Sequence, residues 1–314
     1  MRHLMLFIFF GYLQTAMHAQ TNSCFDDLLQ IGLNTFNEKD YDNASESWQA
    51  ALNKCEPNVE QQQKLNGYIN QAKTALNNNT PTPSATTHYS FEPETVLVQG
   101  GSFQMGSNGD GENEKLVHIV TLNSYYIGKY ELTQKQWRDV MRSDPAKLAF
   151  SGCDDCPVER VSWEEVQIYL QQLNLKTGKH YRLPTEAEWE FAARGGNSSK
   201  NYTYSGSDSI VDVAWYEANS SGKAHTVHGL QANELGIYDM TGNVWEWCSD
   251  WFDENYYERS PAQNPKGADS GFYRVARGGG WGATSANCRV AFRYKFTPSL
   301  RNNRLGFRVA LSSQ

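Results

Sequence analysis

A stretch without large apolar residues divides this chain into two unlike parts. Residues 77–88 read NNNTPTPSATTH and contain two prolines, a composition typical of a semi-extended linker. Eight of the nine tryptophans lie after this stretch, so the two parts must bury very different cores. We therefore predict a helical module at 20–77, a linker at 78–90 and a larger, aromatic-rich domain at 91–314.

The first 19 residues have the pattern of a secretory signal peptide. A basic start at Arg2 precedes an apolar run at 4–13, and alanines stand just before Gln20. That run of about ten residues is too short to cross a bilayer, which takes about 20 apolar residues. We expect an exported protein without a transmembrane segment in the mature chain, whether periplasmic, held at the cell surface or secreted.

Export makes the six cysteines candidates for disulfides, because thiols oxidise outside the cytosol. By position we expect three pairs, Cys24-Cys55, Cys153-Cys156 and Cys248-Cys288. The Cys-x-x-Cys precedes Pro157 in a loop. A structural bridge is therefore favoured there over a redox-active pair, which would need a helix N-terminus to lower a thiol pKa.

The charge balance argues against nucleic acid as a partner. The chain has 28 Lys+Arg against 35 Asp+Glu, a formal net charge of −7, and no run of basic residues. Phosphate binding draws on clustered Lys and Arg, so we expect no nucleic-acid surface. The sequence also lacks the motifs of a serine-hydrolase elbow, a phosphate-binding P-loop and a zinc-protease helix.

The module has the periodicity of amphipathic helices. One apolar stripe runs through 28–36 and another through 41–52, and a third helix is expected at 58–76. The spacing over 32–52 resembles part of a tetratricopeptide repeat. Since a single repeat cannot bury its apolar face alone, a helical hairpin acting as a spacer is the alternative.

Three helix starts in the larger domain carry a capping box. The pairs are Thr133 with Gln136, Ser162 with Glu165, and Thr185 with Glu188. Alternating apolar and polar residues predict strands within 95–105, 117–122 and 125–130. Later residues offer short strands and many turns, so we predict an α+β domain with irregular loops and no alternating βαβ sheet.

Seven strings occur in order along this domain. They are 100–106 (GGSFQMG), 128–133 (GKYELT), 157–163 (PVERVSW), 181–195 (YRLPTEAEWEFAARG), 236–251 (GIYDMTGNVWEWCSDW), 277–281 (RGGGW) and 305–309 (LGFRV). Together they resemble the formylglycine-generating enzyme, or sulfatase-modifying factor, family. The resemblance implies a compact C-type lectin-like α+β fold that is low in regular secondary structure.

The resemblance also implies a test of activity. Active members oxidise a target-protein cysteine with molecular oxygen and bind Cu(I) through two cysteines five residues apart, a soft-ligand set that suits this ion. By position these cysteines fall on Ala283 and Cys288, and the serine of the family motif falls on Gly280. One thiolate cannot make the two-coordinate site, so Cu(I) is not expected, and Cys288 would be catalytic only in an oxidase.

The loop at 236–251 matches a calcium site of the family. By position the oxygen donors would be Asp239, Gly242, Val244 and Glu246. Calcium takes six to eight oxygen ligands, of which two acids and backbone carbonyls could supply most. The alternative is that Glu246 accepts hydrogen bonds from backbone amides.

Aromatic residues around the matched loops could form a binding surface. The tryptophans are Trp245, Trp247, Trp251 and Trp281. They form either the core or a platform for a peptide or glycan, and we expect a ligand groove at Trp281, Ala283 and Tyr294. We interpret His225-x-x-His228 as a surface loop, and expect the four arginines after residue 288 to donate to carbonyls of turns: Arg289, Arg293, Arg304 and Arg308.

Two functions remain open. The first is a divergent, exported family member that binds a protein or peptide, or a glycan, as an extracytoplasmic or envelope-assembly module. The second is a formylglycine-generating oxidase that converts a sulfatase cysteine with Cys288 as its sole thiol.

Overall fold

The computed structural model describes residues 28–33, 41–55, 57–79, 91–109, 111, 114–145 and 147–313. The chain divides into two compact units, 1–87 and 88–314, which are described separately below. The expected signal peptide, the residue Cys24 and most of the expected linker lie outside the described residues. The Cys24-Cys55 pairing therefore stays a prediction.

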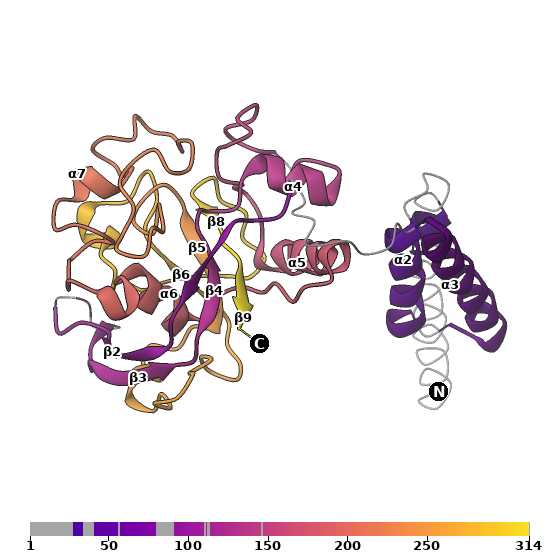
Figure 1. The fold of residues 1–314 in the computed structure, drawn as a ribbon, viewed down its shortest axis with the longest axis horizontal. Coiled ribbons are helices and arrows are strands. Elements are labelled where there is room, and N and C mark those ends of the chain that lie inside the picture. The colour runs from indigo at the N-terminus through magenta and orange to yellow at the C-terminus, as the bar shows by residue number, and fades with distance from the viewer. Residues whose placement is uncertain are drawn as a thin grey trace, which may run out of the picture. The chain divides into compact units, whose positions relative to one another are not determined.

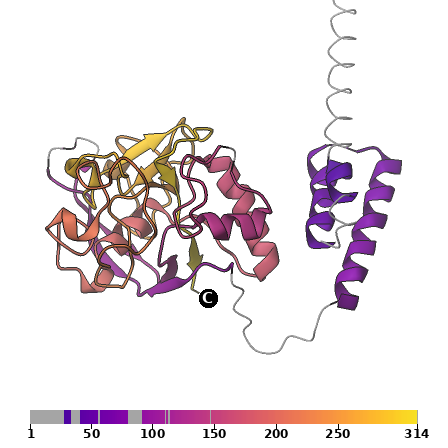
Figure 2. The same cartoon turned by 90° about the horizontal axis from the view of Figure 1, so that it is seen from above.

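The N-terminal unit contains two helices that pack side by side, α2 (Tyr41–Lys54) and α3 (Val59–Asn79) (Figure 1, Figure 2). The expected third helix is α3, which begins one residue late and extends into the expected linker. Trp48 is buried between the helices and stacks on Tyr68 at 4.9 Å. A Cβ on Gly32 would collide with the Trp48 indole, so the helical segment 28–33 needs glycine for this close approach.

The three predicted capping boxes are confirmed. Each cap side chain accepts a bond from the backbone N–H three residues later, and the cap's own backbone N–H donates to the side chain of that later residue. These caps stand at the starts of α4 (Gln134–Met141), α5 (Trp163–Thr177) and α6 (Glu186–Ala193). Helix α5 ends at Gly178 with φ 67°, a left-handed conformation that favours glycine. Local sequence therefore determines where these helices begin.

Three small sheets complete the larger unit. The first has the strand order β1-β4-β9, and the second is the hairpin of β2 and β3. The third has the order β7-β6-β5-β8, in which β5 and β8 are parallel. The bounds are β1 Thr95–Val98, β2 Gly101–Met105, β3 His118–Leu122, β4 Tyr125–Gly128, β5 Trp245–Trp251, β6 Arg274–Arg277, β7 Tyr294–Phe296, β8 Leu305–Gly306 and β9 Ala310–Ser312.

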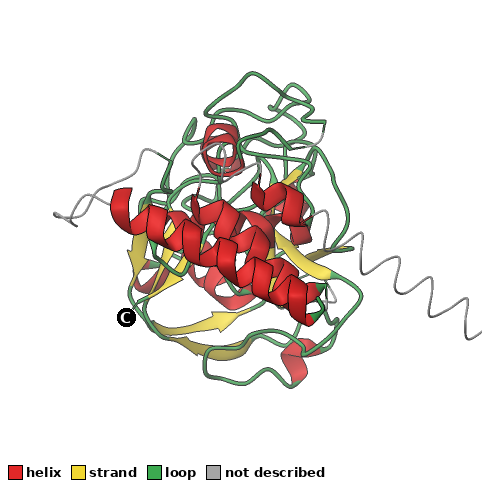
Figure 3. Ribbon diagram, turned by 90° about the vertical axis from the view of Figure 1, so that its right-hand side faces the viewer, coloured by secondary structure: helices red, strands yellow, loops and turns green. Residues whose placement is uncertain are grey.

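Long loops join these elements and make up most of the domain (Figure 3). Four further short helical turns lie in them: η2 (Gly196–Ser198), α7 (Ile210–Val213), η3 (Tyr256–Glu258) and η4 (Ser285–Cys288). The predicted α+β domain with little regular structure is confirmed. None of the described helices is both long and apolar enough to cross a membrane.

The sheet of β5 and β6 separates two hydrophobic cores. Cys248 and Val275 belong to one core, whereas Trp247, Ala276 and Cys288 belong to the other. Successive residues of a strand face opposite sides of the sheet, so Cys248 points away from the core that contains Cys288. The expected Cys248-Cys288 disulfide is therefore wrong, and both thiols are free and buried. The expected Cys153-Cys156 bridge is present.

Candidate functional site

The loop that follows β6 builds the position where active relatives would hold copper. Gly278 and Gly279 both have positive φ, 92° and 77°, so the chain turns sharply there. A Cβ on Gly279 would lie 2.5 Å from the Cys288 Sγ, which makes glycine necessary for the approach. This turn brings Ala283 and Cys288 into one core cluster with Trp245. We call these three residues the thiol corner.

The thiol corner is buried from solvent. Cys288 is fully buried and Ala283 is 7% exposed. Burial raises the pKa of the Cys288 thiol to about 12, so the sulfur is protonated at neutral pH. Because the thiolate is the metal ligand and nucleophile, a single protonated sulfur does not fit a Cu(I) dithiolate site.

Two of the three residues of the expected ligand groove, Trp281 and Ala283, are buried. Trp281 is 9% exposed, and its Nε1 donates to the carbonyl oxygen of Asn303 at 2.9 Å. Only Tyr294 is exposed, and its ring lies 5.2 Å from that of Trp245. Trp245 and Trp247 are buried together, so the core interpretation is correct for them, and packing against the core closes the corner.

The loop expected to bind calcium is closed by protein donors. Each carboxylate oxygen of Glu246 accepts from the Arg308 guanidinium at 2.7 Å, and Oε2 also accepts from Trp189 Nε1 at 2.8 Å. The Asp239 carboxylate accepts from the His228 backbone at 2.7 Å, and burial raises the Asp239 pKa to about 6. Calcium would have to displace Arg308 from Glu246.

The other two expected calcium ligands belong to the same closed loop. The Gly242 backbone N donates to Gly278 O at 2.8 Å, and the Val244 backbone N donates to the buried Glu131 carboxylate at 3.0 Å. These N–H bonds do not involve the carbonyl oxygens of Gly242 and Val244, which are the groups expected to bind calcium. Arg308 occupies both carboxylate oxygens of Glu246, so calcium would need to displace a cationic side chain there, and the calcium site stays a prediction.

Residues 225–228 form an irregular loop, as expected. The His225 ring stacks on Trp215 at 3.9 Å, and its Nε2 is 2.7 Å from the carbonyl oxygen of Ser220. The His228 ring packs near Tyr130. Both histidines therefore contact residues outside this loop, which indicates a structural role.

Sequence reasoning missed a buried ion-pair network behind the thiol corner. Arg277 is fully buried and donates to Glu190 at 2.5 Å and to Glu186 at 3.2 Å, and Arg293 makes two bonds to Glu186. Burial acts to raise the pKa of Glu190, but Arg194 and Arg277 outweigh it and hold that pKa below its usual value. The signal was present, since Glu186 and Glu190 are four residues apart and share one face of α6.

Three of the four arginines expected to donate to turns, Arg289, Arg293 and Arg308, pair with buried acids. Arg289 forms a bidentate pair with Glu114, with both bonds at 2.7 Å. Arg308 bonds the carbonyl oxygens of Gly128 and Tyr238 in addition to Glu246. Arg304 lies over the Trp281 ring at 4.4 Å. These contacts join loops that are distant in sequence, so we assign these arginines a structural role.

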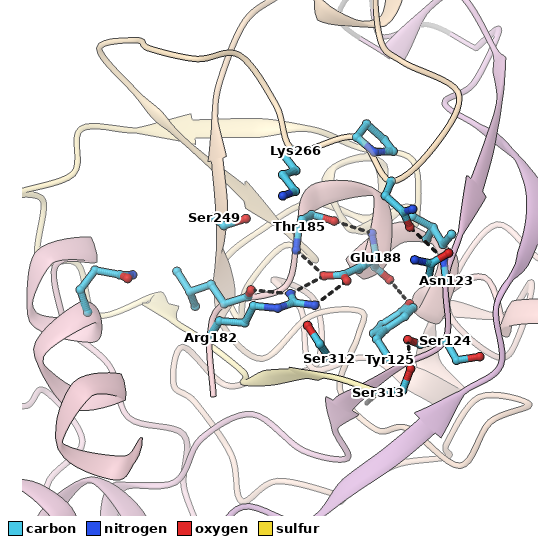
Figure 4. A pocket seen from close by; sticks show the side chains of 15 residues that line it. Asn123, Ser124, Tyr125, Arg182, Thr185, Glu188, Ser249, Lys266, Ser312 and Ser313 are labelled. Carbon is cyan, nitrogen blue, oxygen red and sulfur yellow. Dashed lines mark hydrogen bonds and ion pairs between the residues drawn. The ribbon is translucent and has the colours of Figure 1, made fainter. Parts of the chain in front are cut away.

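A cavity lies elsewhere, beside the C-terminal strand β9. Its volume is about 690 Å³, and we call it the β9 cavity (Figure 4). It is lined by residues of six chain segments: 122–125, Gln167, 182–188, Ser249, 264–266 and 312–313. No sequence motif predicted it, because these segments meet only in the folded domain.

An ion pair forms part of the cavity wall. Arg182 makes two bonds to the Glu188 carboxylate, at 2.6 and 2.7 Å, and the Tyr125 hydroxyl donates to the Glu188 backbone carbonyl at 2.6 Å. In Figure 4, Lys266 and Ser249 lie on one side of this pair, and Ser312 and Ser313 on the other. The exposed ammonium of Lys266 has no ion-pair partner among the described residues.

Comparisons with known proteins agree with the motifs. The sulfatase-modifying factor enzyme 1-like domain matches residues 80–313. The chaperone protein LppX of Paenibacillus barcinonensis is 34% identical over 269 residues, which cover 70% of this chain and 89% of LppX. The formylglycine-generating enzyme of Streptomyces coelicolor is 37% identical over 190 residues, 55% of this chain and 57% of that enzyme.

A solved structure supports the same fold. Treponema denticola variable protein 1 superposes with a TM-score of 0.66 at 31% identity, covering 74% of this chain and all of that one. The family match spans about three quarters of the chain, and LppX is matched over most of its length. The chain therefore belongs to the sulfatase-modifying factor family.

Proposed function

We propose that this chain is a divergent family member that acts outside the cytoplasm as a protein-binding or envelope-assembly module. The single observation that carries this proposal is the thiol corner: one buried, protonated sulfur at Cys288 and an alanine at position 283. Fold does not by itself imply activity, so the site residues decide. The donor set for the copper chemistry of active relatives is incomplete here.

A relative's name supports a protein as the partner class. LppX, which is matched over 89% of its length, is described as a chaperone protein. A chaperone acts on other proteins, so we prefer a protein or peptide partner to a glycan. The signal-peptide pattern at 1–19 supports the extracytoplasmic location.

The second candidate is a formylglycine-generating oxidase. The observation that favours it is the 37% identity to the Streptomyces coelicolor enzyme, although the aligned residues span only 57% of that enzyme. It would require Cys288 to act alone and to become a thiolate in a buried setting.

Copper binding and peptide oxidation separate the two candidates. The full chain is titrated with Cu(I) against a colorimetric chelator and then incubated with a Cys-x-Pro-x-Arg peptide in air. We expect no stoichiometric copper binding and no aldehyde by mass spectrometry. Stoichiometric binding with aldehyde formation in the wild type would overturn the proposed function.

The Ala283→Cys variant is the matched comparison for this assay. It places a second thiol in the cluster that already contains Cys288. We expect the variant to gain Cu(I) affinity by at least about tenfold, because two soft ligands replace one. A wild type that binds as tightly as the variant would show that position 283 is not what limits this site.

A further inference from the structure

The β9 cavity has features that the copper and calcium expectations do not use. Its volume of about 690 Å³ lies within the range of ligand pockets, about 300–1,000 Å³. Leu122, Leu183 and Pro265 supply apolar walls, and most other lining residues carry hydroxyl, amide or charged groups. A ligand here would need both apolar surface and hydrogen-bonding groups.

The edge of β9 supplies backbone groups at this cavity. Strand β9 pairs with β4 on one side, and on the other side Ala310 exchanges two backbone bonds with Arg182, at 2.7 and 2.9 Å. Alternate residues of an antiparallel strand direct their backbone groups to the same side. The N–H and C=O of Ser312 therefore point away from β4, as those of Ala310 do, and no described residue forms a backbone bond with them.

The charge of the cavity selects an anion. Arg182 and Glu188 neutralise each other through two short bonds. Lys266 then contributes one positive charge at the cavity, although the formal net charge of the whole chain is −7. A carboxylate that approached Lys266 would meet an ammonium that no described acid has already paired.

Amide groups extend this donor set. The Gln167 Nε2 is buried and has no hydrogen-bond partner among the described residues. The Asn264 side-chain oxygen accepts from the Asn123 backbone at 2.8 Å, which leaves its amide nitrogen to donate elsewhere. These donors suit carboxylate or peptide-carbonyl oxygens.

We propose that the β9 cavity binds an extended peptide segment bearing a carboxylate. The backbone of this peptide would continue the sheet at Ser312, and its Asp, Glu or C-terminal carboxylate would pair with Lys266. Strand addition of this kind draws affinity from main-chain bonds and specificity from pockets for side chains. The proposal rests on the proposed protein-binding function and names the partner's chemistry.

Peptide selection with cavity variants tests this proposal. The full chain is immobilised and used to select from a random heptapeptide phage library, and the enriched peptides are synthesised for fluorescence anisotropy. Lys266→Glu reverses the charge, and Ser312→Pro removes the free N–H without removing a bond to β4. Lys223→Glu makes the same charge change at an exposed residue that does not line the cavity.

We expect enriched peptides to share an Asp or Glu. The Kd should weaken at least about tenfold in Lys266→Glu and in Ser312→Pro, and should be unchanged in Lys223→Glu. Circular dichroism checks that Ser312→Pro folds. If that variant does not fold, the Kd of the Lys266→Glu variant, whose changed side chain is exposed, still tests the proposal.

Two results would overturn the proposal. One is the absence of any enriched peptide, and the other is peptides that bind both cavity variants as tightly as the wild type. The second result would leave the binding function intact and exclude only this cavity. Failure of the binding function itself would appear separately, as aldehyde formation in the copper assay.

Discussion

The thiol corner and the β9 cavity belong to one domain but differ in whether their reactive groups have partners. At the corner, Cys288 is sealed by aromatic and aliphatic side chains, and the arginines behind it pair with buried acids. At the cavity, Lys266 and the backbone of Ser312 are unpaired among the described residues. The difference indicates that the residues at positions 283 and 288 are part of the core, whereas polar groups without a partner among the described residues lie at the β9 cavity.

The largest expected effect is on stability, and it comes from removing Arg277 from the buried ion-pair network behind the thiol corner. Arg277 ties α6 to the loop after Cys288 through Glu186, Glu190 and the carbonyl oxygens of Val290 and Ala291. Arg277→Leu should lower the free energy of unfolding by about 3–5 kcal/mol, because it leaves buried carboxylates without their partner. Urea unfolding measures this change.

The exposed pair of Arg301 and Glu165 provides the control. Arg301→Leu should leave the urea midpoint almost unchanged, because solvent screens an exposed ion pair. If Arg277→Leu and Arg301→Leu lowered the free energy of unfolding equally, the stabilising role assigned to the buried Arg277 ion pairs would be contradicted.

Thiol labelling tests whether the corner is closed. In the folded chain, Cys248 and Cys288 should not react with a maleimide, because both are fully buried. In denaturant without reductant, both should react, and the mass should rise by two labels. If the unfolded chain takes up no label, the two cysteines are joined by a disulfide, as expected from the sequence.

Asp250, which follows the cavity-lining residue Ser249, should make the stability of the fold depend on pH. Burial, with a contribution from Glu186, raises the pKa of Asp250 to about 7, against about 4 in the unfolded chain. Between these values the folded state binds more protons than the unfolded state, so the contribution of Asp250 to stability falls as pH rises from about 4 to 7. Above pH 7 this contribution is constant.

The Asp250→Asn variant isolates this effect. The melting temperature of the wild type relative to the variant should fall between pH 5 and pH 8. A difference that does not change with pH would mean that Asp250 titrates normally. Asp239, whose pKa is raised to about 6, should act in the same direction.

The smallest expected effect concerns calcium. Since both Glu246 oxygens bond Arg308, adding millimolar calcium should not raise the melting temperature of the wild type. Differential scanning fluorimetry with calcium and with a chelator provides the comparison. A rise of several degrees with calcium would show that the ion displaces Arg308 and would restore the expected site.

The fold was largely predictable from sequence. The capping residues Thr133, Ser162 and Thr185 specify the starts of three helices through bonds within four residues. The seven ordered strings indicated the family through residue identity and order alone. The alanine at position 283 was by itself the reason not to expect the copper dithiolate that the resemblance implies.

The candidate site was less predictable, because its contacts join distant residues. Elimination paired Cys248 with Cys288, but strand alternation directs these side chains into different cores. Arg289, Arg293 and Arg308 were expected to donate to turns. Each pairs with a glutamate that is distant in sequence, up to 175 residues away for Arg289.

The sequence by itself determined the family, the helix starts and the alanine at position 283, because each depends on residue identity or on neighbours along the chain. Only the tertiary structure decided that Cys288 is buried, that Glu246 faces Arg308 and that six separate segments line the β9 cavity. These properties depend on burial and on long-range pairing, and both arise only when the sheets and loops pack.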